Sequence, residues 1–322
     1  MKRALVTGGS GFVGANLVRR LLREGHEVHL ILRDGHQPWR LAGIMSDVRA
    51  IGCDLTDADS VRDAVAAAKP DWVFHLAAYG AYPTQTGFAR MVAVNVLGGA
   101  NLMQCCAEAG VEFFANAGSS SEYGYKTAAA RESDRIEPNS HYAITKAAAT
   151  HYGQLVARGA GLHCVTFRLY SIYGPYEEPT RLIPTLLVHG LRGGLPPLVA
   201  PDTARDFVHV DDAVEAFVRA AREGAGAPGA VYNVASGTQT TLAEVVEHAR
   251  RLLRISAEPA WGTLGRREWD TSVWRGDPSA LHGAIGWRAE VDLSRGLQST
   301  LDWLRSAPDM LRFYESRIGP RA

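Results

Sequence analysis

Short apolar runs and stretches of helical periodicity alternate along the first half of the chain. The apolar runs predict strands at residues 4–6, 28–32, 48–51, 72–74, 113–115 and 163–169. Apolar positions three and four apart predict helices at residues 16–23, 58–68, 88–109 and 141–158. Strands separated by helices of this length indicate βαβ units, and therefore a parallel sheet with right-handed crossovers.

The alternation weakens after about residue 170, where prolines become frequent. Six prolines fall between residues 175 and 201. Because proline limits helices and central strands, this stretch is expected to form a loop-rich lobe. Helical spacing returns at residues 212–222, 241–253 and 293–305.

The charges of the chain balance, with 34 Lys+Arg against 34 Asp+Glu. Non-specific binding to nucleic acid or to an anionic membrane needs a cationic face, so neither is expected as a partner. The four cysteines show no metal-site spacing and are expected to be buried reduced thiols, with no metal bound. The sequence lacks a signal-peptide pattern and a long apolar run, so the expected location is cytoplasmic.

A glycine-rich segment joins the first predicted strand to the first predicted helix. In it, Gly8 and Gly11 are followed by Phe12, Val13 and Gly14. Glycine at the three positions permits a tight turn, a close approach of the backbone to a diphosphate, and close helix–strand packing. The start of the helix offers N–H groups and a positive dipole end to the anion. The segment therefore predicts a dinucleotide-binding site.

Two residues after the second predicted strand give opposite indications about the dinucleotide. Asp34 lies twenty residues beyond Gly14, at the spacing of an acid that binds the ribose 2′-hydroxyl of NAD. Arg33 precedes it, and an arginine there pairs with the 2′-phosphate of NADP. Asp54, after the third strand, is suited either to the adenine N–H groups or to capping its own loop.

Tyr142 and Lys146 lie four residues apart on a predicted helix and so share one face. A tyrosine with its ordinary pKa of about 10 transfers protons poorly at neutral pH. A lysine ammonium one turn away is expected to lower that pKa by stabilising the phenolate. The pair is expected to exchange a proton with a sugar hydroxyl or ketone while a hydride moves to or from a nicotinamide.

With these motifs the sequence resembles the extended short-chain dehydrogenase/reductases, in the branch of nucleotide-sugar epimerases, dehydratases and reductases. The resemblance covers nearly the whole chain and is carried by residues 8–14, 54–55, 75–78, 95–96, 119–124, 142–146, 168–175 and 205–212. It implies an α/β fold with a Rossmann domain, a doubly wound parallel sheet, over residues 1–170 with a return segment near 206–236. Residues 171–205 and 237–322 would form a smaller C-terminal α/β substrate-binding lobe. A homodimer is also implied.

The family pattern assigns further residues to the cofactor and to catalysis. The cofactor contacts it implies beyond the glycine loop are Asp54, Leu55, Leu76, Ala77, Ala78, Asn95, Tyr142 and Lys146. Ser119 matches the hydroxyl that hydrogen-bonds the reacting oxygen beside Tyr142. Family members that use NAD carry an acid at the position of Leu32, whereas members with an arginine there tend to use NADP. Arg33 follows Leu32, so NADP(H) is favoured, with NAD(H) as the alternative.

The match to the family is less complete on the substrate side. The residues expected to bind the nucleotide sugar are Tyr79, Ser120, Ser171, Arg181, Arg205 and Arg267. Arg205 and Arg267 match arginines that pair with the substrate diphosphate, a role suited to the planar guanidinium. Surface roles for the arginines and a packing role for Tyr79 are the alternatives. Ser171 stands where epimerases often carry asparagine.

The residues after Ser119 discriminate between reactions. The 4,6-dehydratases of the family carry a carboxylate pair or a glutamate there, whereas this chain has Ser120 and Ser121, with Glu122 displaced by one. This departure argues against dehydration. The sequence favours an NADPH-dependent reductase of a nucleotide-linked 4-keto-6-deoxyhexose. The alternative is an NAD(P)-dependent nucleotide-sugar 4-epimerase; a 4,6-dehydratase and a non-catalytic dinucleotide sensor are less favoured.

Overall fold

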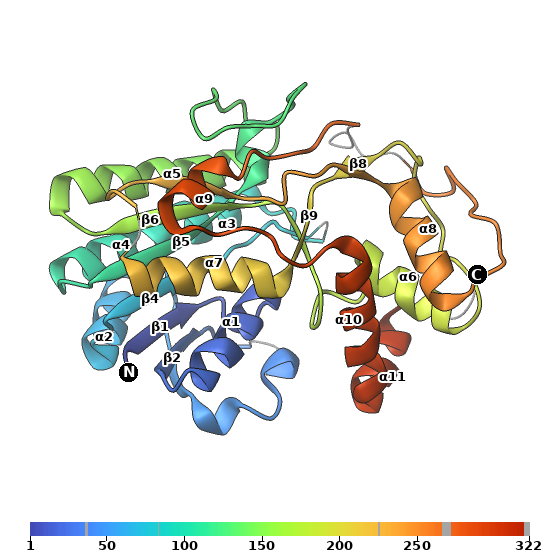
Figure 1. Cartoon of the computed structure of the whole chain (residues 1–322). Helices are drawn as coiled ribbons and strands as arrows, with labels where there is room; N and C mark the ends of the chain where they lie inside the picture. The colour runs from blue at the N-terminus through green and yellow to red at the C-terminus, as the bar shows by residue number, and fades with distance from the viewer. Residues whose placement is uncertain (36–37, 83, 225, 266–271, 319–322) are drawn as a thin grey trace.

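A seven-stranded parallel sheet forms the centre of the computed structural model, which describes residues 1–35, 38–82, 84–224, 226–265 and 272–318 (Figure 1). Its strands are β1 (Arg3–Thr7), β2 (Glu27–Leu32), β3 (Arg49–Gly52), β4 (Trp72–His75), β5 (Phe113–Ser119), β6 (Cys164–Leu169) and β10 (Val231–Val234). The strand order is β10-β6-β5-β4-β1-β2-β3, so the chain winds outwards from β1 in both directions. The predicted doubly wound α/β fold is confirmed, and all six predicted strands are present.

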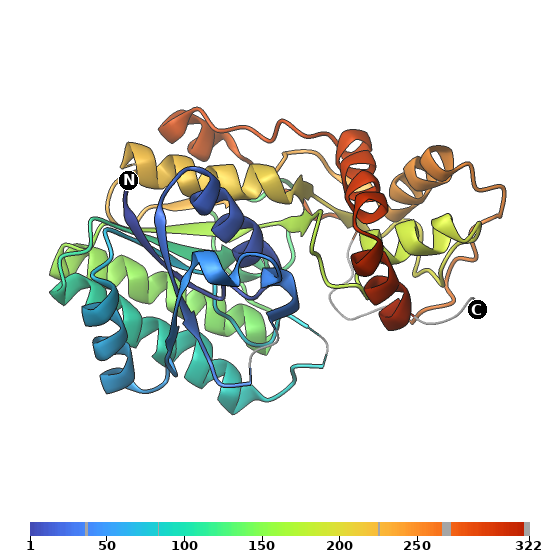
Figure 2. The same cartoon turned by 90° about the horizontal axis from the view of Figure 1, so that it is seen from below.

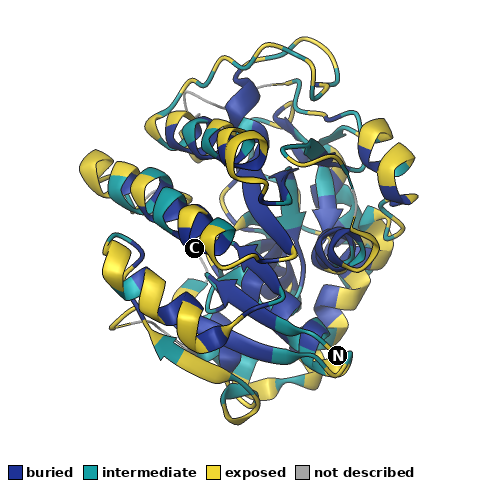
Figure 3. Ribbon diagram, turned by 90° about the vertical axis from the view of Figure 1, so that its left-hand side faces the viewer, coloured by how far each residue is buried: buried dark blue, intermediate teal, exposed yellow. Residues whose placement is uncertain are grey.

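Helices cover both faces of the sheet, which explains why its strands are apolar runs without alternation. Figure 2 shows α1 (Phe12–Arg23), α7 (Val210–Glu223) and α9 (Ser279–Ile285) on one face, and α2 (Ala58–Ala68), α4 (Gly99–Glu108) and α5 (His141–Ala160) on the other. Successive strand residues enter different cores, since side chains alternate. Val6 packs under α1 and α7, whereas Leu5 packs under α2 and α4. Figure 3 shows the buried strands between helices with exposed outer sides.

The helix expected at residues 88–109 is divided into three segments. It begins as α3 (Phe88–Met91), widens into a π-helix over Val92–Gly98 and continues as α4. A π-helix is rare and frequently marks a functional position. The periodicity of apolar residues does not reveal it, because the helix axis continues through all three segments.

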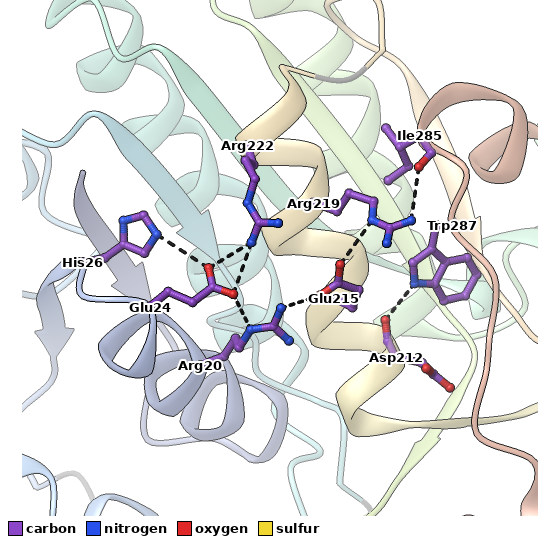
Figure 4. Close-up of polar contacts among 9 residues, drawn as sticks. All are labelled: Arg20, Glu24, His26, Asp212, Glu215, Arg219, Arg222, Ile285 and Trp287. Carbon is purple, nitrogen blue, oxygen red and sulfur yellow. Dashed lines mark hydrogen bonds and ion pairs between the residues drawn. The ribbon is translucent and has the colours of Figure 1, made fainter. Parts of the chain in front are cut away.

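An ion-pair network joins α7 to α1, the helix that follows the glycine loop (Figure 4). The Glu24 carboxylate accepts hydrogen bonds from Arg20 at 2.5 Å and from Arg222 at 3.0 Å. Arg20 also donates to Glu215 on α7 at 2.6 Å. These side chains are about a quarter exposed, except for the more exposed Arg222. The network therefore holds α1 in place with partly screened charges.

The proline-rich stretch after residue 170 contains a helix, so the prediction of a loop-rich stretch is partly wrong. Helix α6 (Leu182–Leu191) carries Pro184 in its first turn, where the missing N–H costs no helical hydrogen bond. It packs with α8 (Leu242–Leu253), α10 (Leu293–Ser306) and α11 (Pro308–Ile318) around a separate apolar core. Two small sheets lie near this core, β7 (Ser171–Tyr173) with β9 (Phe207–His209) and β8 (Ala204–Arg205) with β11 (Thr240–Thr241).

The segment that follows β7 contacts both the main sheet's helices and this second core. The Asn16 amide of α1 donates to the Pro175 carbonyl at 3.0 Å, and Arg40 donates to the Tyr176 carbonyl at 2.8 Å. The Tyr314 hydroxyl of α11 donates to the Glu177 carbonyl. Tyr176 adopts a φ of 70°, a strained value for a residue other than glycine. The many contacts around it hold this strained backbone.

The four cysteines are buried and unpaired, as the sequence predicts. Within the described ranges, no helix has the length and apolar character needed to cross a membrane.

Candidate active site

The loops after β1 and β4 meet where the winding direction of the sheet changes, the usual ligand position in such folds. Gly8 has a φ of +70°, and a Cβ on it would lie 2.5 Å from the Ala77 nitrogen. A Cβ on Gly14 would lie 2.2 Å from the Gly8 carbonyl oxygen. Helix α1 begins after Gly11 with no side-chain cap on its N–H groups. This uncapped helix start beside a glycine-rich loop fits the diphosphate of a dinucleotide.

The ends of β2 and β3 bring Arg33 and Asp54 together. Asp54 caps its own loop, because its Oδ1 accepts hydrogen bonds from the Thr56 N–H at 2.9 Å and hydroxyl at 2.8 Å. These bonds lower the pKa of Asp54, and the charge of Arg33 lowers it further. Arg33 is exposed and directly follows the buried Leu32. The loop-capping alternative for Asp54 is thus observed, while the adenine contact stays a prediction.

Asn95 lies in the π-helix and holds the loop that follows β4. Its Oδ1 accepts the Tyr79 N–H at 2.8 Å, and its Nδ2 donates to the Tyr79 carbonyl at 2.8 Å. Nδ2 also donates to the Thr145 hydroxyl on α5 at 3.0 Å. Both amide hydrogens are therefore used within the protein. The geometry makes Asn95 a link between the Tyr79 loop and the helix that carries Tyr142.

Ser119, Tyr142 and Lys146 converge at the carboxyl end of β5. The Ser140 side chain caps α5, which places Tyr142 and Lys146 in its first turns on one face. The Ser119 side chain lies close enough to the Tyr142 phenol to influence its pKa. Lys146 is only 4% exposed.

The pKa values of this set differ from the sequence-based expectation. Burial raises the pKa of Tyr142 to about 12, the Glu122 carboxylate adds to the rise, and the Ser119 side chain opposes it. The net lowering expected beside Lys146 is not observed, because burial outweighs the contributions that oppose it. Burial lowers the pKa of Lys146 to about 8, opposed by Glu122. In this environment, Tyr142 is a protonated acid at neutral pH.

The displaced acid Glu122 is fully buried behind Ser119. It lies in the short helix Ser120–Tyr123, and its Oε1 accepts the Ser119 N–H at 2.8 Å. Its Oε2 accepts from Arg168 Nε at 2.9 Å. Sequence reasoning did not assign this pair, although a serine with a glutamate three residues later is the signature of a capping box.

A tryptophan that the sequence analysis did not identify adjoins the expected substrate residues. The Trp274 indole N–H donates to the Ser120 hydroxyl at 3.2 Å. The Arg205 guanidinium lies 5.5 Å from the Trp274 ring centre, on its face. Ser120, Trp274 and Arg205 thus form one group next to Ser119.

The other expected substrate residues lie in different surroundings. Arg181 is half-exposed before α6, 3.8 Å from the Glu177 carboxylate, and its charge reaches Tyr142. Ser171 lies in β7 opposite Phe207. The Arg90 guanidinium lies over the Tyr79 ring, 4.9 Å from the centre of that ring. Arg267 lies outside the described residues.

Comparisons with known proteins agree with this arrangement. A UDP-glucose 4-epimerase of Mycolicibacterium smegmatis is 30% identical, and the match covers 94% of this chain and 99% of the relative. A probable dTDP-glucose 4,6-dehydratase of Sinorhizobium fredii is 29% identical, with 94% of this chain and 92% of the relative covered. A GDP-6-deoxy-D-mannose reductase of Pseudomonas aeruginosa is 28% identical, with 94% of this chain and 97% of the relative covered. The solved Thermus thermophilus UDP-glucose 4-epimerase complex with NAD superposes with a TM-score of 0.83 at 29% identity, covering 95% of this chain and 99% of that one.

The family model described as "NAD dependent epimerase/dehydratase family" matches residues 4–235. That span contains the glycine loop, Ser119, Tyr142 and Lys146. The chain therefore belongs to this family, the extended short-chain dehydrogenase/reductases that act on nucleotide sugars with NAD(P).

Proposed function

We propose that the protein is an NADPH-dependent reductase of a nucleotide-linked 4-keto-6-deoxyhexose. The observation that carries the proposal is a single proton donor at the reacting centre. Tyr142 is a protonated acid beside Ser119, and the positions of the dehydratase acids hold Ser120 and Ser121. Glu122 is fully buried, with both oxygens occupied by Arg168 and the Ser119 N–H. Reduction of a ketone needs one proton, whereas dehydration needs a second acid or base.

In this reaction the residues of the chain hold the ketone and supply its proton. NADPH, which the glycine loop and Arg33 would hold, would supply the hydride for C4 and thereby be oxidised to NADP⁺. The Ser119 hydroxyl and the Tyr142 phenol bond the C4 oxygen, and Tyr142 gives its proton to that oxygen as C4 becomes an alcohol. The Lys146 ammonium, one helical turn away, stabilises the phenolate left on Tyr142. Solvent returns the proton afterwards.

The preference for NADPH rests on the end of β2. Leu32 is apolar where family members that use NAD carry an acid, and the exposed Arg33 follows it. A guanidinium pairs with the 2′-phosphate by a bidentate, charge-assisted contact. Replacement of Arg33 by alanine is expected to raise the dissociation constant of NADPH about tenfold and to change that of NADH less than twofold. Tighter binding of NADH by the unmodified protein would contradict the preference.

A nucleotide sugar is the substrate class that the Arg205 group supports. Arg205 lies over the Trp274 ring, and Trp274 bonds Ser120, the residue after Ser119. The Arg205 cation suits the diphosphate of the substrate, while Ser120 and Trp274 suit the sugar.

The decisive experiment follows NADPH absorbance with a dTDP-, CDP-, GDP- or UDP-linked 4-keto-6-deoxyhexose. We expect one NADPH consumed per product formed, and no turnover by Tyr142→Phe. Interconversion of 4-hydroxy sugar epimers without net NADPH consumption would favour the 4-epimerase, the activity named for the Thermus thermophilus neighbour. Full turnover by Tyr142→Phe would contradict both reactions.

We further propose a homodimer formed by the outer face of α3, the π-helix, α4 and α5. Exposed apolar side chains gather along these elements, namely Phe88, Val92, Leu97, Ile144 and Leu155. Pairing with a second copy would remove them from water. Leu155→Glu is expected to yield monomers in sedimentation experiments. Leu264→Glu, which changes an exposed leucine elsewhere, is expected to leave the dimer intact.

A further inference from the structure

The fully buried Glu122 makes more contacts within the site than its role in the helix cap requires. Its two oxygens have separate partners, the Ser119 N–H at 2.8 Å and Arg168 Nε at 2.9 Å. Arg168 is 3% exposed and lies across the Tyr123 ring, 4.4 Å from its centre. Tyr123 is itself fixed by a hydrogen bond from its hydroxyl to Asn233 at 2.8 Å. The carboxylate therefore has little freedom to move.

The strand before it is adapted to this carboxylate. Residue 118 is glycine, and a Cβ there would lie 2.9 Å from Glu122 Oε1 and 2.8 Å from a methyl of Thr166. The missing side chain opens the space that Glu122 occupies. In the same turn, Ser119 Oγ accepts the Ser121 N–H at 3.2 Å, so backbone and hydroxyl of Ser119 are both held.

We propose that Glu122, held by Arg168, is a positioning residue that fixes the Ser119 hydroxyl and places a negative charge near Tyr142 and Lys146. The proposal rests on the function proposed above, in which Ser119 and Tyr142 bond the ketone oxygen. Glu122 acts through these residues, because its own oxygens are occupied within the protein.

The charge acts on both titrating residues. Burial raises the pKa of Tyr142, and Glu122 raises it further, so the phenol keeps its proton to higher pH. Burial lowers the pKa of Lys146, and Glu122 opposes that change, so the ammonium is retained to higher pH. Burial opposes the charge of Arg168, but Glu122 and Tyr123 together outweigh burial, so the pKa of Arg168 is raised and it remains a cation.

The test variant is Glu122→Gln, whose amide oxygen can still accept the Ser119 N–H while the charge is lost. We expect kcat to fall about tenfold with KM changed less than threefold. The basic limb of the kcat–pH profile should move about one unit to lower pH, because both Lys146 and Tyr142 lose their protons more readily. Glu132→Gln is the matched control, since Glu132 accepts a backbone N–H from Asn233 at 2.7 Å without being among the charges that act on Tyr142 or Lys146.

A second variant separates positioning from folding. Glu122→Gln leaves the Arg168 cation buried without its partner, so Glu122→Gln/Arg168→Met removes both charges and is used where the single variant does not fold. A folded variant, single or double, with the native basic limb and native kcat overturns the inference. Full activity of Tyr142→Phe instead overturns the proposed function. An inactive Tyr142→Phe with a shifted Glu122→Gln profile supports both.

Discussion

Replacing Gly14 by alanine tests the packing of the glycine loop against α1. The added Cβ would lie 2.2 Å from the Gly8 carbonyl oxygen, 2.8 Å from its carbon and 2.9 Å from the Gly9 Cα. All three are backbone atoms, so no side-chain rotation relieves the overlap, and ordinary contact needs a retreat of about 1 Å. On its other side Gly8 is closed in by the backbone of Leu76 and Ala77. The loop and α1 must therefore separate.

The cost of that separation can be bounded. Overpacking of this kind costs about 1–3 kcal/mol. The better helix propensity of alanine returns about 1 kcal/mol at most. After this offset, we expect the free energy of unfolding to fall by about 0–2 kcal/mol. The dissociation constant of NADPH is expected to rise about 10–100-fold, because the N–H groups that face the diphosphate move by about 1 Å.

Urea denaturation measures the first quantity, and quenching or enhancement of NADPH fluorescence on titration measures the second. Gly159→Ala is the matched control, since Gly159 is exposed in α5 and a Cβ there would meet no atom within 4 Å. It is expected to be neutral or slightly stabilising. A Gly14→Ala protein with native cofactor affinity would refute the assignment of this loop to the dinucleotide.

Three further substitutions probe the scaffold, each measured by urea denaturation. Glu24→Gln is expected to cost about 1 kcal/mol at pH 7. The two arginines outweigh burial and lower the pKa of Glu24 in the folded protein. Glu24 therefore stabilises the fold above its unfolded pKa of about 4.3, and this stabilisation is lost as the pH falls through its folded pKa. A loss of unfolding free energy in Glu24→Gln that is as large at pH 3 as at pH 7 would contradict this. Asn95→Leu strands the N–H and carbonyl of Tyr79 and should cost about 2 kcal/mol and reduce turnover; native stability would exclude the link. Trp287 is 1% exposed, so Trp287→Ala leaves a cavity and should lower the free energy of unfolding by about 4 kcal/mol. Trp287→Phe loses mainly the hydrogen bond to the Asp212 carbonyl and should lower it by about 1 kcal/mol.

The sequence predicts the sheet well because its evidence is local and repeated. Each parallel strand is buried on both faces, so each is a short apolar run between amphipathic helices. Helix α6 was missed because proline frequency counted against it, although Pro184 occupies a first-turn position that tolerates proline. The π-helix was missed because one extra residue per turn leaves the apolar spacing nearly unchanged over so short a segment.

The proximity of Tyr142 and Lys146 was predictable for a similar reason. Tyr142 and Lys146 share a face by helix geometry alone, and the glycine loop is contiguous in sequence. Trp274 was not predictable, because it reaches Ser120 across 154 positions through contacts that only the folded chain brings together. Arg267, expected by family pattern, stays a prediction.

Glu122 shows how a correct sequence observation can lead to an incomplete interpretation. Its position one residue beyond the dehydratase acids argues against dehydration, but does not reveal what the carboxylate does instead. That depends on the register of β5 and β6, which places Gly118 opposite Arg168. With any larger residue at 118, the side chain would fill the space in which Glu122 meets Arg168 and the Ser119 N–H. A shift of the register by one residue would turn Arg168 to the other face of the sheet. The glycine, the arginine and the acid therefore form one structural unit, although they are separated by up to fifty positions in the chain.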